Sequence, residues 1–161
     1  AMIASIPADG GTPDTPDAPA SVPFVDIVKG SFYYDAVVWG HNNGIVNGVD
    51  STHFAPDASC TRAQVVTFLW RAAGSPEPKS MSTPFTDVKS GSFYEKAAAW
   101  AYENGIVKGT TETTFAPNAT VTRAQFVTFL WRYEGCPSSS IANPFSDVSE
   151  SSVYALSLIH I

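Results

Sequence analysis

Residues 61–74, TRAQVVTFLWRAAG, recur at residues 122–135 as TRAQFVTFLWRYEG, and these two stretches decide the fold. In each, Thr is followed three residues later by Gln, which fits a capping box: the Thr hydroxyl accepts a first-turn amide and the Gln side chain reaches back. An apolar run with helical spacing follows. Glycine and then proline end the run. The pattern predicts one helix after Thr61 and another after Thr122.

The sequence before these helices repeats as well. PFVDIVKGSFYYDAVVWGHNNGIVNG begins at Pro23 and PFTDVKSGSFYEKAAAWAYENGIVKG begins at Pro84. The two copies align without a gap, and more than half of their positions are identical. A third opening, PFSDVSESSVY, begins at Pro144 but loses the pattern after Tyr154, and ALSLIHI has no Trp. A repeat of this length is typical of helical arrays.

Each full copy predicts a second, earlier helix. Apolar Val37, Val38 and Trp39 give residues 32–43 an apolar side, and a glycine follows as a left-handed C-cap. The equivalent helix covers residues 93–104. A unit of two such helices is too small to bury enough surface alone, but stacked units share a core. The predicted fold is therefore mostly all-α, with tandem helix-loop-helix repeats.

The chain divides at its changes of composition. The first segment is rich in Pro, Asp, Ala and Gly, which is typical of a solvated linker and implies a cargo domain upstream. The expected parts are a linker at 1–22, repeat 1 at 23–78, a short linker at 79–83, repeat 2 at 84–139 and a truncated repeat at 144–161.

Composition narrows the possible partners. The formal net charge is −6 with nine Lys and Arg, which argues against a nucleic-acid partner. No run reaches the roughly 18 apolar residues that a membrane span requires. Cys60 and Cys136 stand at non-equivalent positions, so they form no disulfide framework and are expected to be small buried side chains.

A search for catalytic and metal-binding patterns finds none. The histidines His41, His53 and His160 are isolated, and none recurs in the equivalent position. The sequence has no zinc-type His pair, no Cys-x-x-Cys, no nucleophile elbow and no phosphate loop. We therefore predict a chain that is not an enzyme and that needs no metal and no cofactor.

Arg62 and Arg123 are the strongest candidates for a binding role. Each stands in the first turn of a predicted helix, where the helix dipole makes a cation unfavourable by about 0.3–1 kcal/mol at an exposed site. A helix N-terminus presents free amides to an anion, and an adjacent Arg adds a fork of donors. Pairing with an acid such as Asp57 or Asp87 is the alternative.

Two further sets have both a binding and a structural interpretation. Gly48 and Gly109 allow close approach of a ligand, although a simple requirement of the turn is favoured, and Asn47 and Lys108 precede them. Indole rings stack on sugars, but core packing is favoured for all four tryptophans, Trp39, Trp70, Trp100 and Trp131. The Asp residues of the PFxD openings, Asp26, Asp87 and Asp147, are expected to cap helices.

The order of motifs resembles the S-layer homology repeat. The order is PFxD, a helix with Trp, NGIVxG, TFAPxxxxTRAQ (HFAP in the first copy), FLWR and Gly-x-Pro. Two full copies run from Pro23 to about Pro137, and a third copy opens at Pro144. The resemblance implies a partial pseudo-threefold helical bundle with grooves between neighbouring repeats. It also implies a bacterial cell-surface location, in the cell wall or S-layer.

The resemblance further implies non-covalent anchoring to an anionic cell-wall polysaccharide, a secondary cell-wall polymer that is often pyruvylated. It assigns the main polymer contact to Arg62 and Arg123. The turn residues Asn47, Gly48, Lys108 and Gly109 join that site, together with Gln64 and Gln125, which replace the family's Glu. The alternatives are a helical scaffold for protein partners, or the anchor tail of a surface glycoside hydrolase whose catalytic domain lies outside this chain.

Overall fold

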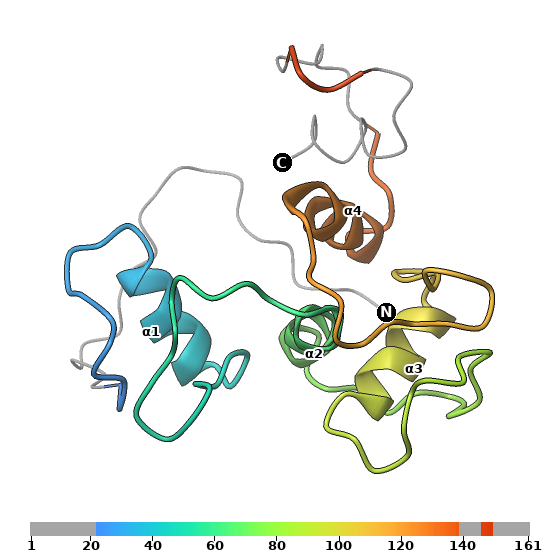
Figure 1. Ribbon diagram of the computed structural model, residues 1–161, viewed down its shortest axis with the longest axis horizontal. Helices are drawn as coiled ribbons and strands as arrows, with labels where there is room; N and C mark the ends of the chain where they lie inside the picture. The colour runs from blue at the N-terminus through green and yellow to red at the C-terminus, as the bar shows by residue number, and fades with distance from the viewer. Residues whose placement is uncertain (1–21, 139–145, 150–161) are drawn as a thin grey trace.

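The computed structural model describes residues 22–138 and 146–149, and this part of the chain contains four α-helices and no strand (Figure 1). The helices are α1 (Tyr34–Asn42), α2 (Arg62–Ala72), α3 (Glu95–Glu103) and α4 (Arg123–Tyr133). The mostly helical prediction is confirmed. Most of the linker 1–22, His160 and the loss of pattern after Tyr154 lie outside the described residues.

Both predicted capping boxes form. The Gln64 amide donates to Thr61 Oγ1 at 3.3 Å, and the Thr61 amide donates to Gln64 Oε1 at 2.8 Å. The same two bonds link Thr122 and Gln125 before α4. They satisfy amides that a helix N-terminus otherwise leaves free, which fixes where each helix begins.

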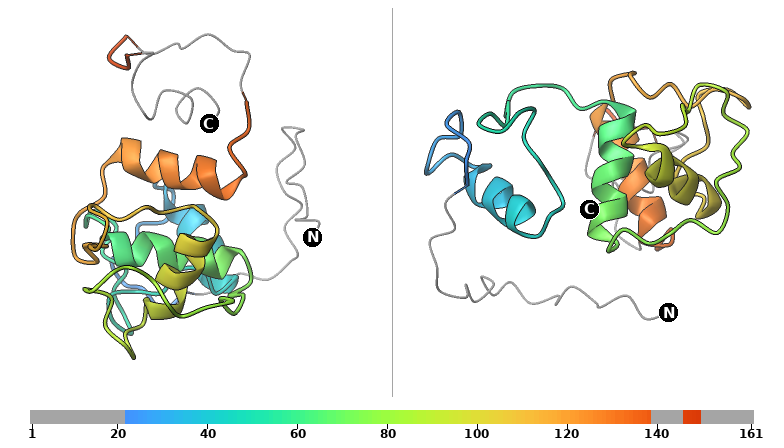
Figure 2. Two further views of the ribbon diagram at one scale, coloured as in Figure 1. Left: turned by 90° about the vertical axis from the view of Figure 1, so that its right-hand side faces the viewer. Right: turned by 90° about the horizontal axis from the view of Figure 1, so that it is seen from below.

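The helices pair across the repeat boundary rather than within a repeat. α2 packs against α3 of the next repeat and more lightly against α4, whereas α1 packs against none of the other three described helices. Figure 1 and the right-hand view of Figure 2 show α1 and its loop apart from the group formed by α2, α3 and α4. The predicted shared core is therefore formed by helices of neighbouring copies.

Small residues allow α2 and α3 to approach closely. Ala97, Ala98 and Ala101 of α3 are fully buried and belong to one apolar cluster with Val65 and Val66 of α2. Burial of each valine contributes about 1.5–3 kcal/mol relative to exposure. The cluster continues into the loop of repeat 2 through Phe115, which is fully buried.

The tryptophans show the consequence of this pairing. Trp100 on α3 is 7% exposed, whereas Trp39, at the same position on α1, is 61% exposed. The core assignment is therefore right for Trp100 and wrong for Trp39, because α1 is covered by none of the other helices in residues 22–138. Trp70 and Trp131 are half-buried, and each indole N–H donates to a proline carbonyl just past the end of its helix.

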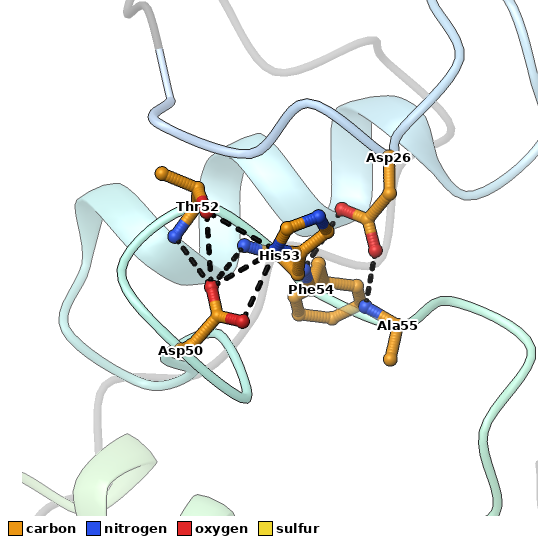
Figure 3. Close-up of polar contacts among 6 residues, drawn as sticks. All are labelled: Asp26, Asp50, Thr52, His53, Phe54 and Ala55. Atoms are coloured by element: carbon orange, nitrogen blue, oxygen red, sulfur yellow. Dashed lines mark hydrogen bonds and ion pairs between the residues drawn. The ribbon is translucent and has the colours of Figure 1, made fainter.

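The PFxD aspartates were expected to cap helices, and for repeats 1 and 2 that expectation is wrong. Asp26 accepts hydrogen bonds from the amides of Phe54 and Ala55, at 2.8 and 2.7 Å (Figure 3). Asp87 binds the equivalent amides of repeat 2 at the same distances. Each carboxylate thus holds the loop at an alanine with positive φ, 59° at Ala55. Asp147 is exposed.

The cysteines also differ from expectation. Cys60 and Cys136 are both free thiols on exposed residues. Cys60 lies next to the start of α2, where its carbonyl accepts the Val121 amide at 3.0 Å. The neighbouring residues Thr61 and Thr120 form an antiparallel bridge that ties the two loops together. Backbone pairing of this segment leaves the thiol at the surface.

Candidate ligand-binding groove

A groove of about 490 Å³ lies beside α2 in repeat 1. Its wall includes Asn47 and Gly48 from the Gly-Ile-Val-x-Gly turn and Gln64 from the first turn of α2. The structure therefore brings three of the predicted site residues together. Phe93 from repeat 2 also lines it, so the groove lies between neighbouring repeats.

The turn beside the groove requires glycine. A Cβ atom at Gly48 would lie 2.3 Å from the carbonyl oxygen of His53 and 2.5 Å from a ring carbon of Phe24. Gly109 is equally crowded, with 2.3 Å to the Thr111 carbonyl oxygen. Both distances are far inside van der Waals contact, so packing of the turn itself explains the glycines.

Asp50 organises the loop that carries this turn. Its Oδ1 accepts the amides of Thr52 and His53 at 2.8 Å each, and the His53 ring lies 3.1 Å from the carboxylate (Figure 3). The Thr52 amide and then the His53 side chain lower the pKa of Asp50 from 3.8 to about 2. The amide of Phe54 is the main cause of a lowered pKa at Asp26. Both carboxylates are therefore ionised at neutral pH.

Arg71 gives the groove a cation that the sequence interpretation missed. It lies in the last turn of α2 and lines the groove, with Nη1 3.4 Å from the Ile45 carbonyl oxygen. A guanidinium carries five N–H donors, so four remain for a ligand. Arg132 makes the matching 3.3 Å contact with Ile106 in repeat 2. The repetition of this arginine in FLWR was the signal in the sequence.

Three aromatic rings, those of Phe54, Phe68 and Phe93, line the groove. Phe68 of α2 lines its wall, and Phe93 lines it while remaining 64% exposed. Aromatic faces of this kind suit the apolar face of a sugar ring, with the polar groups of Asn47 and Gln64 beside them. Stacking was considered in the sequence only for the tryptophans, and none of them lines this groove.

Arg62 is not at the groove surface. Its side chain is 5% exposed, and Nε donates to the Phe115 carbonyl oxygen at 2.8 Å. The guanidinium lies 5.1 Å from the centre of the Phe115 ring and 5.3 Å from that of Phe129. Burial lowers the pKa of Arg62, and Asp87 acts in the opposite direction. The side chain therefore joins repeat 1 to repeat 2.

The first amides of α2 are also used within the protein. The Arg62 amide donates to the Ala119 carbonyl at 2.9 Å, and the Ala63 amide to the Pro117 carbonyl at 3.0 Å. At α4 the situation differs: Arg123 is exposed, and within residues 22–138 its amide and that of Ala124 have no acceptor. Only the second of the two predicted anion sites is open.

Repeat 2 has a less complete site. Lys108 and Gly109 line a shallower hollow of about 450 Å³ with Tyr102, but neither Arg123 nor Gln125 lines it. Among the described residues, those that line this hollow all belong to repeat 2, whereas Phe93 of the following repeat helps to line the groove of repeat 1. Over the described ranges there is also no cluster of three or more His, Cys, Asp or Glu that could hold a metal ion.

The chain is thus built of tandem helical repeats, with a groove lined by polar and aromatic side chains where the two repeats meet. The S-layer homology domain model matches residues 23–66 and 84–127, and the chain belongs to that family. S-layer homology domains are parts of cell-surface and surface-layer proteins, which they anchor to the cell wall. None of the helices in the described part is long and apolar enough to cross a membrane.

Relatives include enzymes and surface proteins. An endoglucanase of Bacillus sp. (strain KSM-635) is 39% identical over 103 residues, which cover 64% of this chain and 11% of that protein. A cell surface protein of Thermoanaerobacter kivui is 32% identical over 120 residues, 72% of this chain and 16% of that protein. The surface-layer 125 kDa protein of Lysinibacillus sphaericus is 32% identical over 114 residues, which cover 68% of this chain and 10% of that protein. The chain thus spans less than a fifth of each of these relatives.

Proposed function

We propose that this chain anchors a larger surface protein non-covalently to an acidic polysaccharide of the cell wall, without catalysing a reaction. The observation that carries the proposal is the repeat 1 groove. It combines amide groups, a guanidinium and three aromatic rings, of which Phe93 is exposed, in a volume of about 490 Å³, which suits a short stretch of sugars.

Within this groove, Arg71 takes the anion. Its free N–H groups match the two oxygens of a carboxylate, such as the one that a pyruvyl ketal adds to a sugar. Asn47 and Gln64 bind hydroxyl groups, and Phe93 packs on a ring face. Arg62 acts as a positioning residue, because its buried guanidinium binds repeat 2 at the Phe115 carbonyl and so holds together the two repeats that line the groove.

A wall-binding assay with matched variants tests this assignment. Arg71→Ala removes the cation of the complete groove, whereas Arg132→Ala removes its equivalent from the less complete site of repeat 2. We expect at least a tenfold loss of affinity for purified wall with Arg71→Ala and less than a twofold change with Arg132→Ala, with near-UV circular dichroism checking that both fold. Equal affinities of the two variants would contradict the assignment.

The same assay identifies the chemistry of the ligand. Binding should fall when the polysaccharide is extracted from the wall, and again when pyruvyl groups are removed from intact polysaccharide. Binding should also weaken with salt, because a partly exposed ion contact is screened. Full binding to stripped wall would instead favour a protein or peptidoglycan partner.

A further inference from the structure

The dipeptide Asn-Gly occurs three times in the chain, at residues 43–44, 47–48 and 104–105. Asparagine followed by glycine is prone to spontaneous deamidation, because glycine has no side chain to shield its backbone nitrogen from the asparagine side-chain carbon. The following residue is the same at all three places, so their intrinsic reactivities are comparable. Differences between them in the folded chain therefore come from the local structure.

Two of the three asparagines are held by hydrogen bonds. Asn43 Nδ2 donates to the Trp39 carbonyl at 2.8 Å, and the following amide, that of Gly44, donates to the His41 carbonyl at 2.9 Å. Asn104, just past the end of α3, is held by the equivalent two bonds, at 2.8 and 3.0 Å. Reaction of the asparagine with its neighbour at either place requires both bonds to break.

Asn47 has neither restraint. It is exposed on the wall of the repeat 1 groove. In the described part of the chain, neither its side-chain amide nor the backbone amide of Gly48 makes a hydrogen bond. The side chain is therefore free to turn toward the Gly48 nitrogen, and water reaches it. Repeat 2 has Lys108 at the equivalent position, which cannot react in this way.

We propose that Asn47 is a site of spontaneous deamidation, and that the carboxylate formed there weakens binding of the acidic polysaccharide. Hydroxide removes the Gly48 amide proton, and the Gly48 nitrogen attacks Asn47 Cγ. The bond from Cγ to Nδ2 breaks, and the leaving nitrogen takes a proton from water and departs as ammonia. Water then opens the cyclic imide at either carbonyl, which leaves aspartate or isoaspartate at position 47.

Either product places a negative charge in the groove that Arg71 also lines. This charge repels the carboxylate of a ligand and offers Arg71 a competing partner. Isoaspartate also lengthens the backbone by one carbon, in a turn so tightly packed that a Cβ atom at Gly48 would lie 2.3 Å from the His53 carbonyl oxygen. The turn therefore has to change shape. This effect on binding rests on the proposed function, whereas the deamidation itself does not.

Peptide mapping by mass spectrometry tests the site without any ligand. The full chain is aged at mildly alkaline pH, folded in one sample and unfolded in guanidinium chloride in another. The ratio of folded to unfolded deamidation rate should be about tenfold higher at Asn47 than at Asn43 or Asn104, because two hydrogen bonds protect each of those. A ratio at Asn47 that is no higher than at the other two would overturn the proposal.

Wall binding before and after ageing tests the consequence. Wild-type affinity should fall as the converted fraction of Asn47 rises, and Asn47→Asp should bind about tenfold more weakly than the fresh wild type, as expected for a like charge beside the ligand. Asn47→Gln closes an imide ring far more slowly, so it should keep its own starting affinity after the same ageing.

Two results would overturn the effect on binding. One is an unchanged wild-type affinity when most of Asn47 has been converted, and the other is a loss in aged Asn47→Gln equal to that of the wild type. A fresh wild-type chain that does not bind wall would instead contradict the proposed function. Peptide mapping decides the deamidation site in that case as well, because it uses no polysaccharide.

Discussion

Arg62 and Arg123 occupy equivalent positions and differ in what surrounds them. Arg62 is buried between two rings with its Nε–H bound to the Phe115 carbonyl, whereas Arg123 is exposed. Arg62→Ala should lower the free energy of unfolding by about 2–3 kcal/mol, because a charge-assisted hydrogen bond is lost and a buried carbonyl is left without a donor. Urea denaturation followed by near-UV circular dichroism measures this.

Arg123→Ala is the matched control for that change. Replacing an exposed side chain away from the core changes the free energy of unfolding by no more than about 0.5 kcal/mol. The two alanine variants should therefore differ clearly in stability at low protein concentration. Arg62→Lys should fall between them, since it keeps the charge but not the Nε–H bond. Equal stabilities for Arg62→Ala and Arg123→Ala would show that the junction does not depend on this side chain.

The carboxylates of the repeat 1 loop predict a local response to acid. The pKa of Asp50 is about 2 in the folded chain, against 3.8 as the ordinary value, and that of Asp26 is also lowered. A carboxylate whose pKa is lower in the folded than in the unfolded chain stabilises the fold, and this contribution is complete above the unfolded pKa. It is lost as the pH falls from about 4 toward 2. Once corrected for the intrinsic pH dependence of amide exchange, exchange at Thr52, His53 and Phe54 should therefore accelerate in that window, which means that their protection factors fall.

A matched position in the other repeat serves as the control for the acid response. Thr111 replaces Asp50 in repeat 2, so the amide of Thr113 has no carboxylate partner at that turn and its exchange should change less over the same range. Uniform acceleration across both loops would indicate global unfolding rather than titration of these two groups.

At the scale of the elements, the helices with a capping box could be predicted closely from the sequence. Thr and Gln at the right spacing define a start, and a glycine with positive φ, as at Gly74, defines an end. The α1 and α3 helices begin two residues later than expected. Their first amides are used in turns instead: the Tyr34 amide donates to the Ser31 carbonyl, and the Glu95 amide to the Ser92 carbonyl.

The partners of the helices could not be predicted in the same way. Two copies with the same apolar pattern do not indicate whether a helix packs within its own repeat or against the next one. The equivalent Trp39 and Trp100 therefore looked alike in sequence and differ in burial. For the same reason the family resemblance assigned the polymer contact to both arginines alike. The sequence interpretation missed Arg71 and Phe93, whose role depends on which repeat faces the groove.

The α2–α3 contact predicts an asymmetric response to added bulk. Ala97 is fully buried against α2, so Ala97→Leu should destabilise the core by about 1–3 kcal/mol through overpacking. Ala36→Leu places the same side chain on the exposed face of α1, and its effect on thermal unfolding at low protein concentration should be small. Similar losses from both changes would mean that α1 is covered in solution.

At the scale of the whole molecule, the functional unit crosses the repeat boundary. Repeat 1 supplies the turn, Gln64 and Arg71, and repeat 2 supplies Phe93, while Arg62 holds the two repeats together. Repeat 1 by itself would therefore lack the part of the groove that Phe93 supplies. The two described repeats contain one complete junction, which is why the site residues of repeat 1 meet and those of repeat 2 do not.

The most direct test of this account is a two-dimensional amide NMR titration of the chain with purified wall polysaccharide. We predict saturable shifts at the amides of Asn47, Gly48, Gln64 and Arg71 and at Phe93, with the equivalent residues of repeat 2 changing less. Shifts confined to the exposed Arg123 end, or no shifts at all, would contradict the claim that the sugar binds in the groove between the two repeats.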